Sequence, residues 1–171
     1  IKATLNNLLI PYTSNYAGTL LPGIREYTVT PGEKTTTISG KGKAGLKQEE
    51  NYYFFYLPVC YTAITGKSYA YYITSRSKNL YFPASLDANY SYDIQLPENL
   101  TLCTPIQEKK IDNPIGSFKI TLTSEGSSLH IELALQIKKQ LITPAEYPAF
   151  RSLITEWTDR TRKPILFKTV Q

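Results

Sequence analysis

Apolar and polar residues alternate most regularly between residues 116 and 138. In SFKITLT (117–123) and SLHIELALQIKK (128–139), every second residue is large and apolar, and most of the others are polar. A period of two is typical of a β-strand with one buried and one wet face. The two runs are separated by SEGS, in which Gly126 is available for a positive φ. The pattern therefore predicts a long antiparallel hairpin.

Shorter runs of the same kind predict more strands. They are REYTVTPGEKTTTISG (25–40, two strands around a Pro-Gly turn), NYYFFYLP (51–58), SYAYYIT (68–74), NLYFP (79–83) and YSYDIQLP (90–97). The run at 51–58 is apolar on both faces, which indicates a central strand or half of an interface. Many short strands with turns between them favour a mainly β fold, an antiparallel β-sandwich.

One helix is expected near the end of the chain, over about residues 144–160. Thr143 fits an N-cap, Pro144 the first helical position, and Glu146 a side chain that reaches back to the cap. Pro148 would forfeit a backbone hydrogen bond inside the helix. The pattern therefore predicts either a single turn followed by a restart at Pro148, or a bend there.

The predicted helix is amphipathic. Tyr147, Phe150, Ile154 and Trp157 share one stripe, which predicts a plug over one end or edge of the sandwich. An aromatic box for a ligand is the functional alternative to this packing role. The segment KPILFK (163–168) is then expected to form a final strand.

Composition narrows the class of protein. The 171 residues fit a single domain over 1–171, with a Gly/Lys-rich stretch near residue 45 as the candidate seam. No stretch of about 18 apolar residues appears, so no membrane span is expected. The net charge of +5 is spread along the chain, which argues against nucleic-acid binding. A chain that begins at Ile1 and lacks Met is expected to be a processed product or a fragment.

Residues capable of nucleophilic or metal chemistry are few. Cys60 and Cys103 either pair in an oxidising compartment or are small buried residues on strands. Alternation puts His130, the sole histidine, on the wet face of its strand with Glu132. One histidine and two separated cysteines make neither a catalytic triad nor a metal cluster. We therefore expect no catalytic residue, metal or cofactor, and a protein that is not an enzyme.

Residues 73–168 contain several features that follow one another in a characteristic order. They are an Arg before a short LYFP strand, a strand that ends in Leu-Pro, a Gly-led hairpin, a Pro-x-x-Tyr-x-x-Phe-Arg helix and a basic-apolar last strand. In this order they resemble the C-terminal domain of bacterial, Bacteroidetes-type transglutaminase-like multidomain proteins, over residues 51–171. In that family an N-terminal β-domain precedes a transglutaminase-like core, and a β-rich domain of unknown function closes the chain.

The resemblance implies a non-catalytic accessory or interaction domain. Its partner would be the transglutaminase-like core of the same polypeptide, which it would pack against or position. The location it implies is the periplasm, the cell surface or the medium, with a signal peptide outside this sequence. Residues 1–50 match nothing in the family and would be the lead-in from the core.

Tyrosines suggest an alternative function. The stretches between residues 51 and 92 hold Tyr52, Tyr53, Tyr56, Tyr61, Tyr69, Tyr71, Tyr72, Tyr81, Tyr90 and Tyr92. Exposed rings stack on sugars and anchor interfaces, which would suit an independent glycan- or peptide-binding module. The competing interpretation is that the rings fill the core of the sandwich. The candidate interaction surface is Tyr52, Tyr53, Tyr71, Tyr72 and Tyr81.

Overall fold

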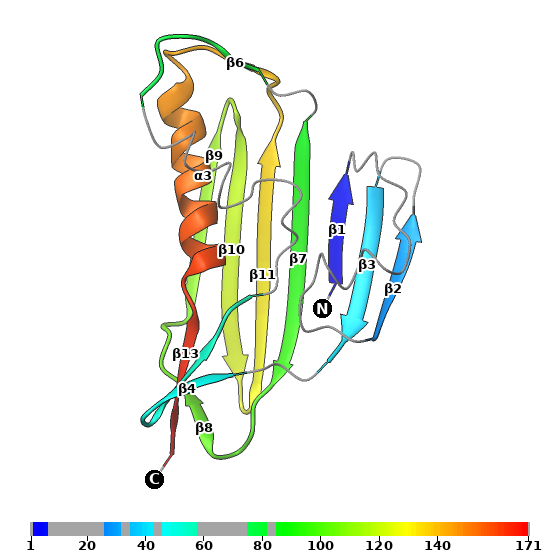
Figure 1. The fold of residues 1–171 in the computed structure, drawn as a ribbon, viewed down its shortest axis with the longest axis vertical. Coiled ribbons are helices and arrows are strands. Elements are labelled where there is room, and N and C mark those ends of the chain that lie inside the picture. The colour runs from blue at the N-terminus through cyan, green and yellow to red at the C-terminus, as the bar shows by residue number, and fades with distance from the viewer. Residues whose placement is uncertain are drawn as a thin grey trace.

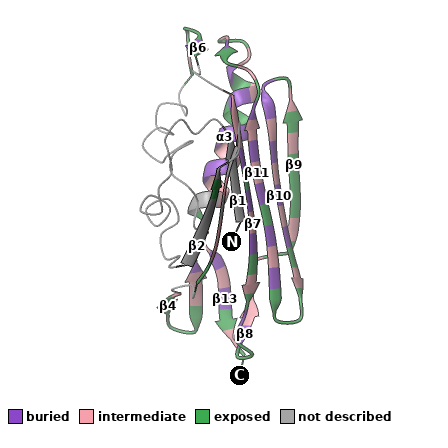
Figure 2. Cartoon of the chain, turned by 90° about the vertical axis from the view of Figure 1, so that its right-hand side faces the viewer, coloured by how far each residue is buried: buried purple, intermediate pink, exposed green. Residues whose placement is uncertain are grey.

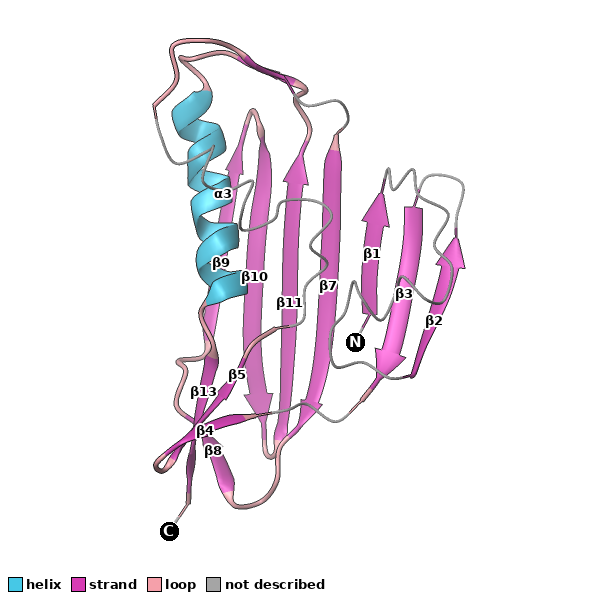
Figure 3. Cartoon of the chain, in the orientation of Figure 1, coloured by secondary structure: helices cyan, strands magenta, loops and turns pink. Residues whose placement is uncertain are grey.

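The computed structural model describes residues 2–6, 26–31, 35–42, 46–57, 75–81 and 85–170. Strands and one helix, α3 (Tyr147–Arg162), make up most of these residues (Figure 3). The strands are β1 (Lys2–Asn6), β2 (Glu26–Pro31), β3 (Thr35–Lys41), β4 (Lys47–Glu49), β5 (Tyr52–Phe55), β6 (Leu80–Tyr81), β7 (Leu86–Gln95), β8 (Leu100–Leu102), β9 (Gln107–Asn113), β10 (Gly116–Glu125), β11 (Ser128–Ile137), β12 (Leu141–Ile142) and β13 (Ile165–Thr169).

The largest layer is a seven-stranded sheet in the order β2-β3-β1-β7-β11-β10-β9 (Figure 1). Its described pairings are all antiparallel. The predicted hairpin lies near one edge: β10 and β11 pair from Gly116↔Ile137 to Glu125↔Ser128. Gly126 in the turn has φ +57°, as expected for a residue in the left-handed region.

The two faces of this sheet differ in burial along β7, β10 and β11, where buried and less buried residues alternate (Figure 2). The inward positions of β7, β10 and β11 carry Ala, Tyr, Phe, Ile and Leu side chains. They are Ala88, Tyr90, Tyr92, Phe118, Ile120, Leu122, Leu129, Ile131, Leu133, Leu135 and Ile137, all at most 3% exposed. The outward positions are partly or fully exposed. The period of two in the sequence is therefore the burial pattern of the sheet.

The second layer combines α3 with a four-stranded sheet in the order β4-β5-β13-β8. Both lie on the apolar side of the large sheet, with β13 continuing from the end of α3 (Figures 1 and 2). A third pairing joins β6 to β12 beyond the start of α3. The chain is thus mainly β and antiparallel, with one C-terminal amphipathic helix and a final strand, as predicted.

The start of the helix differs from the prediction. Residues 143–146 form a turn closed by Glu146 N–H donating to the Thr143 carbonyl oxygen (3.1 Å), and the N-cap is Glu146. Glu146 Oε2 still reaches back, accepting from the Thr143 N–H (3.0 Å) and hydroxyl (2.9 Å). Pro148 falls in the first turn of α3, where no intrahelical N–H is needed. Of the two alternatives, the turn with a restart is therefore correct.

The apolar stripe of α3 lies along the face of the large sheet. Phe150 and Ile154 are fully buried, and Trp157 packs its ring 5.8 Å from that of Tyr90 on β7. Asn113 at the end of β9 donates its side-chain N–H to the Ala149 carbonyl oxygen (3.0 Å). These contacts give the stripe a packing role, with its rings in the core of the molecule.

In the part of the chain that the structure describes, no helix has the length and apolar character needed to cross a membrane.

Candidate functional site

His130 lies on the outward face of the large sheet, as predicted from alternation. Its register on β11 sets it beside Asp93 on β7, and Nδ1 lies 2.7 Å from Asp93 Oδ1. On its other side, Nε2 lies 3.7 Å from Glu132 Oε1, and Lys119 Nζ lies 3.0 Å from Glu132 Oε2. The four side chains form a row of alternating charge across three strands.

This row shifts the pKa of His130 and that of Glu132. The hydrogen bond with Asp93 raises the pKa of His130, and the nearby Glu132 charge acts in the same direction. The hydrogen bond and charge of Lys119 lower the pKa of Glu132. The His130 side chain is 42% exposed, so solvent screens these interactions. The row therefore stabilises the ionised forms of His130 and Glu132 on a wet surface.

An open pocket of about 580 Å³ lies beside His130, toward the hairpin turn. Its lining holds hydroxyl, amide and carboxylate side chains but no cysteine. The described residues therefore supply His130 with a carboxylate to orient it and with no thiol to activate.

The cysteines do not enter this site. Cys103 is half-buried just after β8, and its backbone N–H donates to the Leu166 carbonyl oxygen (2.8 Å). Cys60 lies outside the described residues, so its pairing with Cys103 stays a prediction. Over the described ranges, no group of three or more metal-binding side chains gathers.

The predicted tyrosine surface is divided between two ends of the molecule. Tyr52 and Tyr53 lie on β5, in the small sheet, whereas Tyr81 lies on β6, beyond the opposite end of α3 (Figure 1). Tyr71 and Tyr72 lie outside the described residues. Tyr53 is half-buried and packs against the core, while Tyr52 is 44% and Tyr81 67% exposed. Tyr52 and Tyr81 therefore offer rings to solvent at separate places.

Strand alternation explains why neighbouring rings on β5 behave differently. Successive side chains point to opposite faces, so Tyr53, Phe55 and Leu57 point inward, and the last two are buried. Tyr52, Phe54 and Tyr56 point outward. Across the sheet, Leu166 on β13 pairs with Phe54 and shares their face.

We call the outward residues Tyr52, Phe54, Tyr56 and Leu166 the aromatic face. Tyr56 is 52% exposed, and Phe54 and Leu166 are partly exposed. Of these four residues, the candidate interaction surface predicted from the sequence contained Tyr52 alone, although Tyr56 lies in one of the tyrosine-rich stretches. The alternation of YYFFY was visible, but both of its faces are apolar, so the pattern did not say which face was free.

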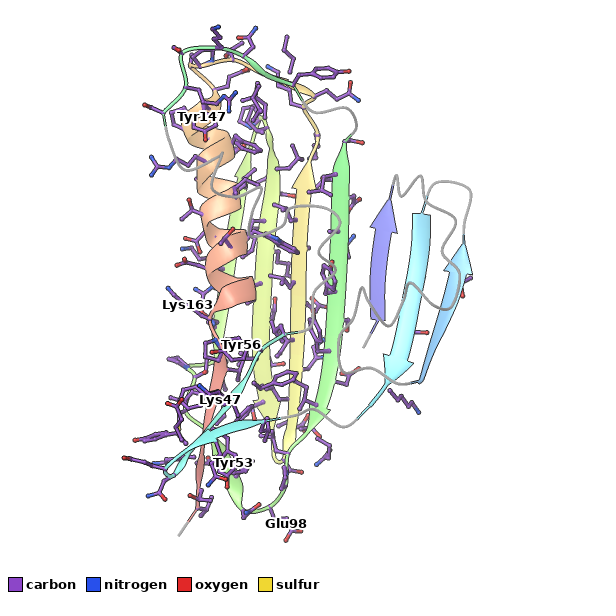
Figure 4. All side chains as sticks on the ribbon, in the orientation of Figure 1. Lys47, Tyr53, Tyr56, Glu98, Tyr147 and Lys163 are labelled. Carbon is purple, nitrogen blue, oxygen red and sulfur yellow. The ribbon has the colours of Figure 1, made fainter. Side chains whose placement is uncertain are left out.

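Charged side chains border the aromatic face. On β4, Lys47 Nζ lies 2.6 Å from Glu49 Oε1, and these residues pair in register with Phe54 and Tyr52. Exposed Lys168 on β13 pairs with Tyr52 from the other side. Lys47 and Tyr56 both lie at the small-sheet end of the molecule, and Tyr147 lies at the far end of α3 (Figure 4). An apolar centre with a charged border is the anatomy of a protein-protein contact.

These features define a two-layer, antiparallel β-domain with one exposed aromatic sheet face. Residues 51–167 match the model of the family described as a Domain of Unknown Function with solved-structure structure (DUF3858). The match spans more than half of the chain, so the chain belongs to this family.

A solved structure is similar to the chain. It is the crystal structure of a protein named "putative protease" from Parabacteroides distasonis, 27% identical, with a TM-score of 0.58. The match covers 71% of this chain and 24% of that protein, so this chain corresponds to about a quarter of that protein's length. Among curated proteins, none matches the chain.

Proposed function

We propose that the chain is a non-catalytic accessory domain of a transglutaminase-like multidomain protein, and that it packs against the catalytic core of the same polypeptide. The observation that carries this proposal is the similarity to a quarter of a much longer protein named for proteolysis. Transglutaminase-like cores and cysteine proteases share a Cys-His-acid mechanism, so that name is compatible with such a core. The resemblance of residues 51–171 to the C-terminal domain of transglutaminase-like proteins supports the same position.

The aromatic face is the contact surface that we assign to this role. Outward positions of the large sheet are mostly polar, as on a wet face, whereas Tyr52, Phe54, Tyr56 and Leu166 are apolar or aromatic. Tyrosine is enriched at interfaces because its ring is large, rigid and amphipathic. Residues that form such contacts are exposed when the domain is viewed alone, as Tyr52 and Tyr56 are.

The location that we propose is the periplasm, the cell surface or the medium. It follows from the family resemblance and needs a signal peptide ahead of the multidomain protein.

The proposal is tested by adding the purified chain to the core in trans and by deleting it from the full polypeptide. We expect binding in trans, and lower stability or activity of the core after deletion. Tyr52→Ser with Tyr56→Ser should weaken binding at least tenfold, whereas Tyr81→Ser, at the other end, should leave it unchanged. Absence of binding together with an unaffected core after deletion would refute the accessory role. Conversion of glutamine-donor substrates by the isolated chain would refute the non-catalytic one.

A second candidate function is an independent glycan- or peptide-binding module, which is favoured by Tyr81. This ring is 67% exposed, and its register partner Leu141 on β12 is 47% exposed. Tyr90 and Tyr92, by contrast, are buried in the core and offer nothing to a ligand. A glycan array and a peptide array that give signals lost in Tyr81→Ala would support this function, and arrays without signals would remove it.

A further inference from the structure

An open pocket of about 410 Å³ lies between α3 and β9, the edge strand of the large sheet. Two contacts join this strand to the helix. Asn113 donates its side-chain N–H to the Ala149 carbonyl oxygen (3.0 Å), and Lys109 Nζ lies 2.5 Å from Glu156 Oε1. Ile111 lies between Lys109 and Asn113 on the same face of β9, and it lines the pocket. The pocket is therefore built into the junction of the strand and the helix.

The helix contributes an apolar surface and an arginine to this pocket. Separations of three and four residues put several lining residues on one side of α3, namely Pro148, Arg151, Ser152 and Thr155. The buried side chain of Tyr147 adds an aromatic ring to the lining. Arg151 is exposed and forms no ion pair with a residue that the structure describes. Its guanidinium group is therefore available to a ligand.

A second arginine lies beside the pocket. Ser75 lines the pocket, and the guanidinium carbon of its neighbour Arg76 lies 6.0 Å from the centre of the Tyr147 ring. The Nε atom of Arg76 is buried and has no hydrogen-bond partner among the described residues. A buried N–H without an acceptor costs free energy, so a ligand that supplies an acceptor there would be stabilised. The arginine before the LYFP strand and the Tyr-x-x-Phe-Arg helix, which are far apart in the sequence, thus meet at one pocket.

The charges at the pocket favour an anionic ligand. Glu156 is the sole carboxylate among the lining residues, and Lys109 pairs with it. The positive charges of Arg151 and Arg76 are not compensated by an ion pair within the described part of the chain. A guanidinium group is a planar fork of N–H donors, and its geometry matches the two oxygens of a carboxylate.

The rest of the lining favours an apolar group next to that carboxylate. Ile111 and Pro148 offer aliphatic surface, and Tyr147 offers the surface of a ring. Pockets for small ligands typically enclose about 300–1,000 Å³ and combine apolar walls with a few polar groups that orient the ligand. The pocket between α3 and β9 has this composition, and its volume suits a small ligand.

We propose that this pocket binds a carboxylate attached to an apolar body, with Arg151 holding the carboxylate and with the body resting on Ile111 and the Tyr147 ring. A small aromatic acid carries such a group, and so does a peptide in which an acidic residue lies next to an aromatic one. Tyr147 lies at one end of α3, whereas Tyr56 of the aromatic face lies beyond the other end (Figure 4). The site is therefore separate from the surface that we assign to the core, and it can be tested independently.

The test titrates the isotope-labelled full chain with benzoate and follows backbone and arginine side-chain N–H groups by NMR. We expect saturable shifts at Ile111, Arg151 and Ser152 and at the Nε–H of Arg76. Benzamide has the shape of benzoate without its charge, and it should bind about tenfold more weakly because it loses the charged hydrogen bonds.

A second arm distinguishes the two sources of the carboxylate. It uses the peptide acetyl-Tyr-Glu-Tyr-amide, with acetyl-Tyr-Gln-Tyr-amide as its neutral control. Tighter binding of the glutamate peptide than of benzoate would identify an acidic peptide segment as the ligand, and the reverse order would identify a small acid. Both results support the proposal.

Variants of two residues locate the carboxylate. Arg151→Ala should weaken benzoate binding about tenfold, whereas Arg151→Lys, which keeps the charge and loses the fork, should weaken it less. Glu156→Gln releases Lys109 from its ion pair at the pocket and should strengthen binding. Chemical denaturation followed by the fluorescence of Trp157, the sole tryptophan, checks that each variant is folded.

Lys110→Ala is the matched control. Lys110 is the neighbour of Ile111 on β9, but its register with Lys119 places it on the outward face of the sheet. The variant thus removes one positive charge from the same strand on the side away from the pocket. Binding of benzoate should be unchanged.

Four results would overturn the proposal. They are the absence of saturable shifts with both benzoate and the glutamate peptide, equal affinity for benzoate and benzamide, equal affinity for benzoate and inorganic phosphate, and full binding by folded Arg151→Ala. The first would remove the site, the second would remove the role of charge, the third would remove the apolar body, and the fourth would remove the role of Arg151.

Discussion

The outward faces of the seven-stranded and the four-stranded sheet differ in composition. On the large sheet, outward positions of β10 and β11 carry Lys119, Thr121, His130 and Glu132, and most inward side chains of β7, β10 and β11 are buried. On the small sheet, both faces of β5 are apolar, so the aromatic face remains partly exposed. The large sheet has a polar outward face of the kind that normally contacts solvent. The other has the composition of a surface with a partner, because apolar rings on both sides of a strand are typical of strands buried on both sides.

A substitution in the buried layer between α3 and the large sheet should lower the free energy of unfolding the most. Phe150 is fully buried between α3 and the large sheet, and its replacement by alanine leaves a cavity that the helix cannot refill. We expect Phe150→Ala to lower the free energy of unfolding by about 3–5 kcal/mol. Exposed Arg151→Ala, its neighbour on α3, should change it by less than about 0.5 kcal/mol. Chemical denaturation measures both, and equal small losses would contradict the packing of α3 described above.

Two glycines of the hairpin allow the cost of a steric clash to be compared with the cost of an unfavourable backbone conformation. A Cβ at Gly116 would lie 1.9 Å from the Gln136 carbonyl oxygen, so β10 and β11 would have to separate there. We expect Gly116→Ala to cost about 3 kcal/mol. Gly126→Ala meets no neighbour but forces φ +57° on alanine, which should cost about 1 kcal/mol. A larger loss at Gly126 than at Gly116 would contradict the register of the hairpin.

The turn before α3 should respond to acid. Hydrogen bonds from Lys139 and from the Thr143 N–H and hydroxyl lower the pKa of Glu146 from its ordinary value of 4.5 to about 2. A lowered folded pKa adds stability above the unfolded value, and this stability is lost as the pH falls through the folded value. We therefore expect Glu146→Ala to lower the midpoint of thermal unfolding by a few degrees at pH 7, with a difference from wild type that shrinks between pH 4.5 and 2.

A conservative variant separates charge from hydrogen bonding at this turn. Glu146→Gln keeps an oxygen that accepts from Thr143 but loses the attraction of Lys139, so its midpoint should lie between the other two. A difference that persists unchanged at pH 2 would show that the carboxylate charge contributes nothing.

The wet face of the large sheet should show the smallest effect on stability. Asp93 raises the pKa of His130, so the stabilising contribution of the pair is present below the ordinary value of 6.5 and is lost as the pH rises through the raised folded value. NMR titration of the sole histidine should give a pKa above 6.5 that falls in Asp93→Asn. An unchanged pKa in that variant would mean that the two side chains are not paired in solution.

Much of the large sheet could be predicted because its strands are long and wet on one face. The ten residues of β10 and of β11 give five repeats of the period each, and the stripe of α3 repeats over three turns. β4 and β8 have three residues each, too few to show a period. β9 reads QEKKIDN, and its charges, which suit an edge strand, replace the apolar alternation that marks the other long strands.

The candidate site was less accessible to sequence reasoning. Tyr52 and Tyr53 are adjacent in sequence. Which of the two rings points inward depends on how β5 pairs with β13 and on the side where the core lies. The pairing of β1 could not be predicted from the sequence either, because its partner β7 lies more than 80 residues away in the chain. Neither pairing leaves a local signal, so only the three-dimensional structure separates the inward ring from the outward one.

In the multidomain protein that we propose, the aromatic face contacts the catalytic core. Hydroxyl-radical footprinting of the isolated chain and of the full polypeptide tests this contact most directly, because the method reports the exposure of individual tyrosine side chains. Oxidation of Tyr52 and Tyr56 should fall several-fold in the full polypeptide, while that of Tyr81 stays the same. Equal oxidation of Tyr52 and Tyr56 in the two proteins would contradict the claim.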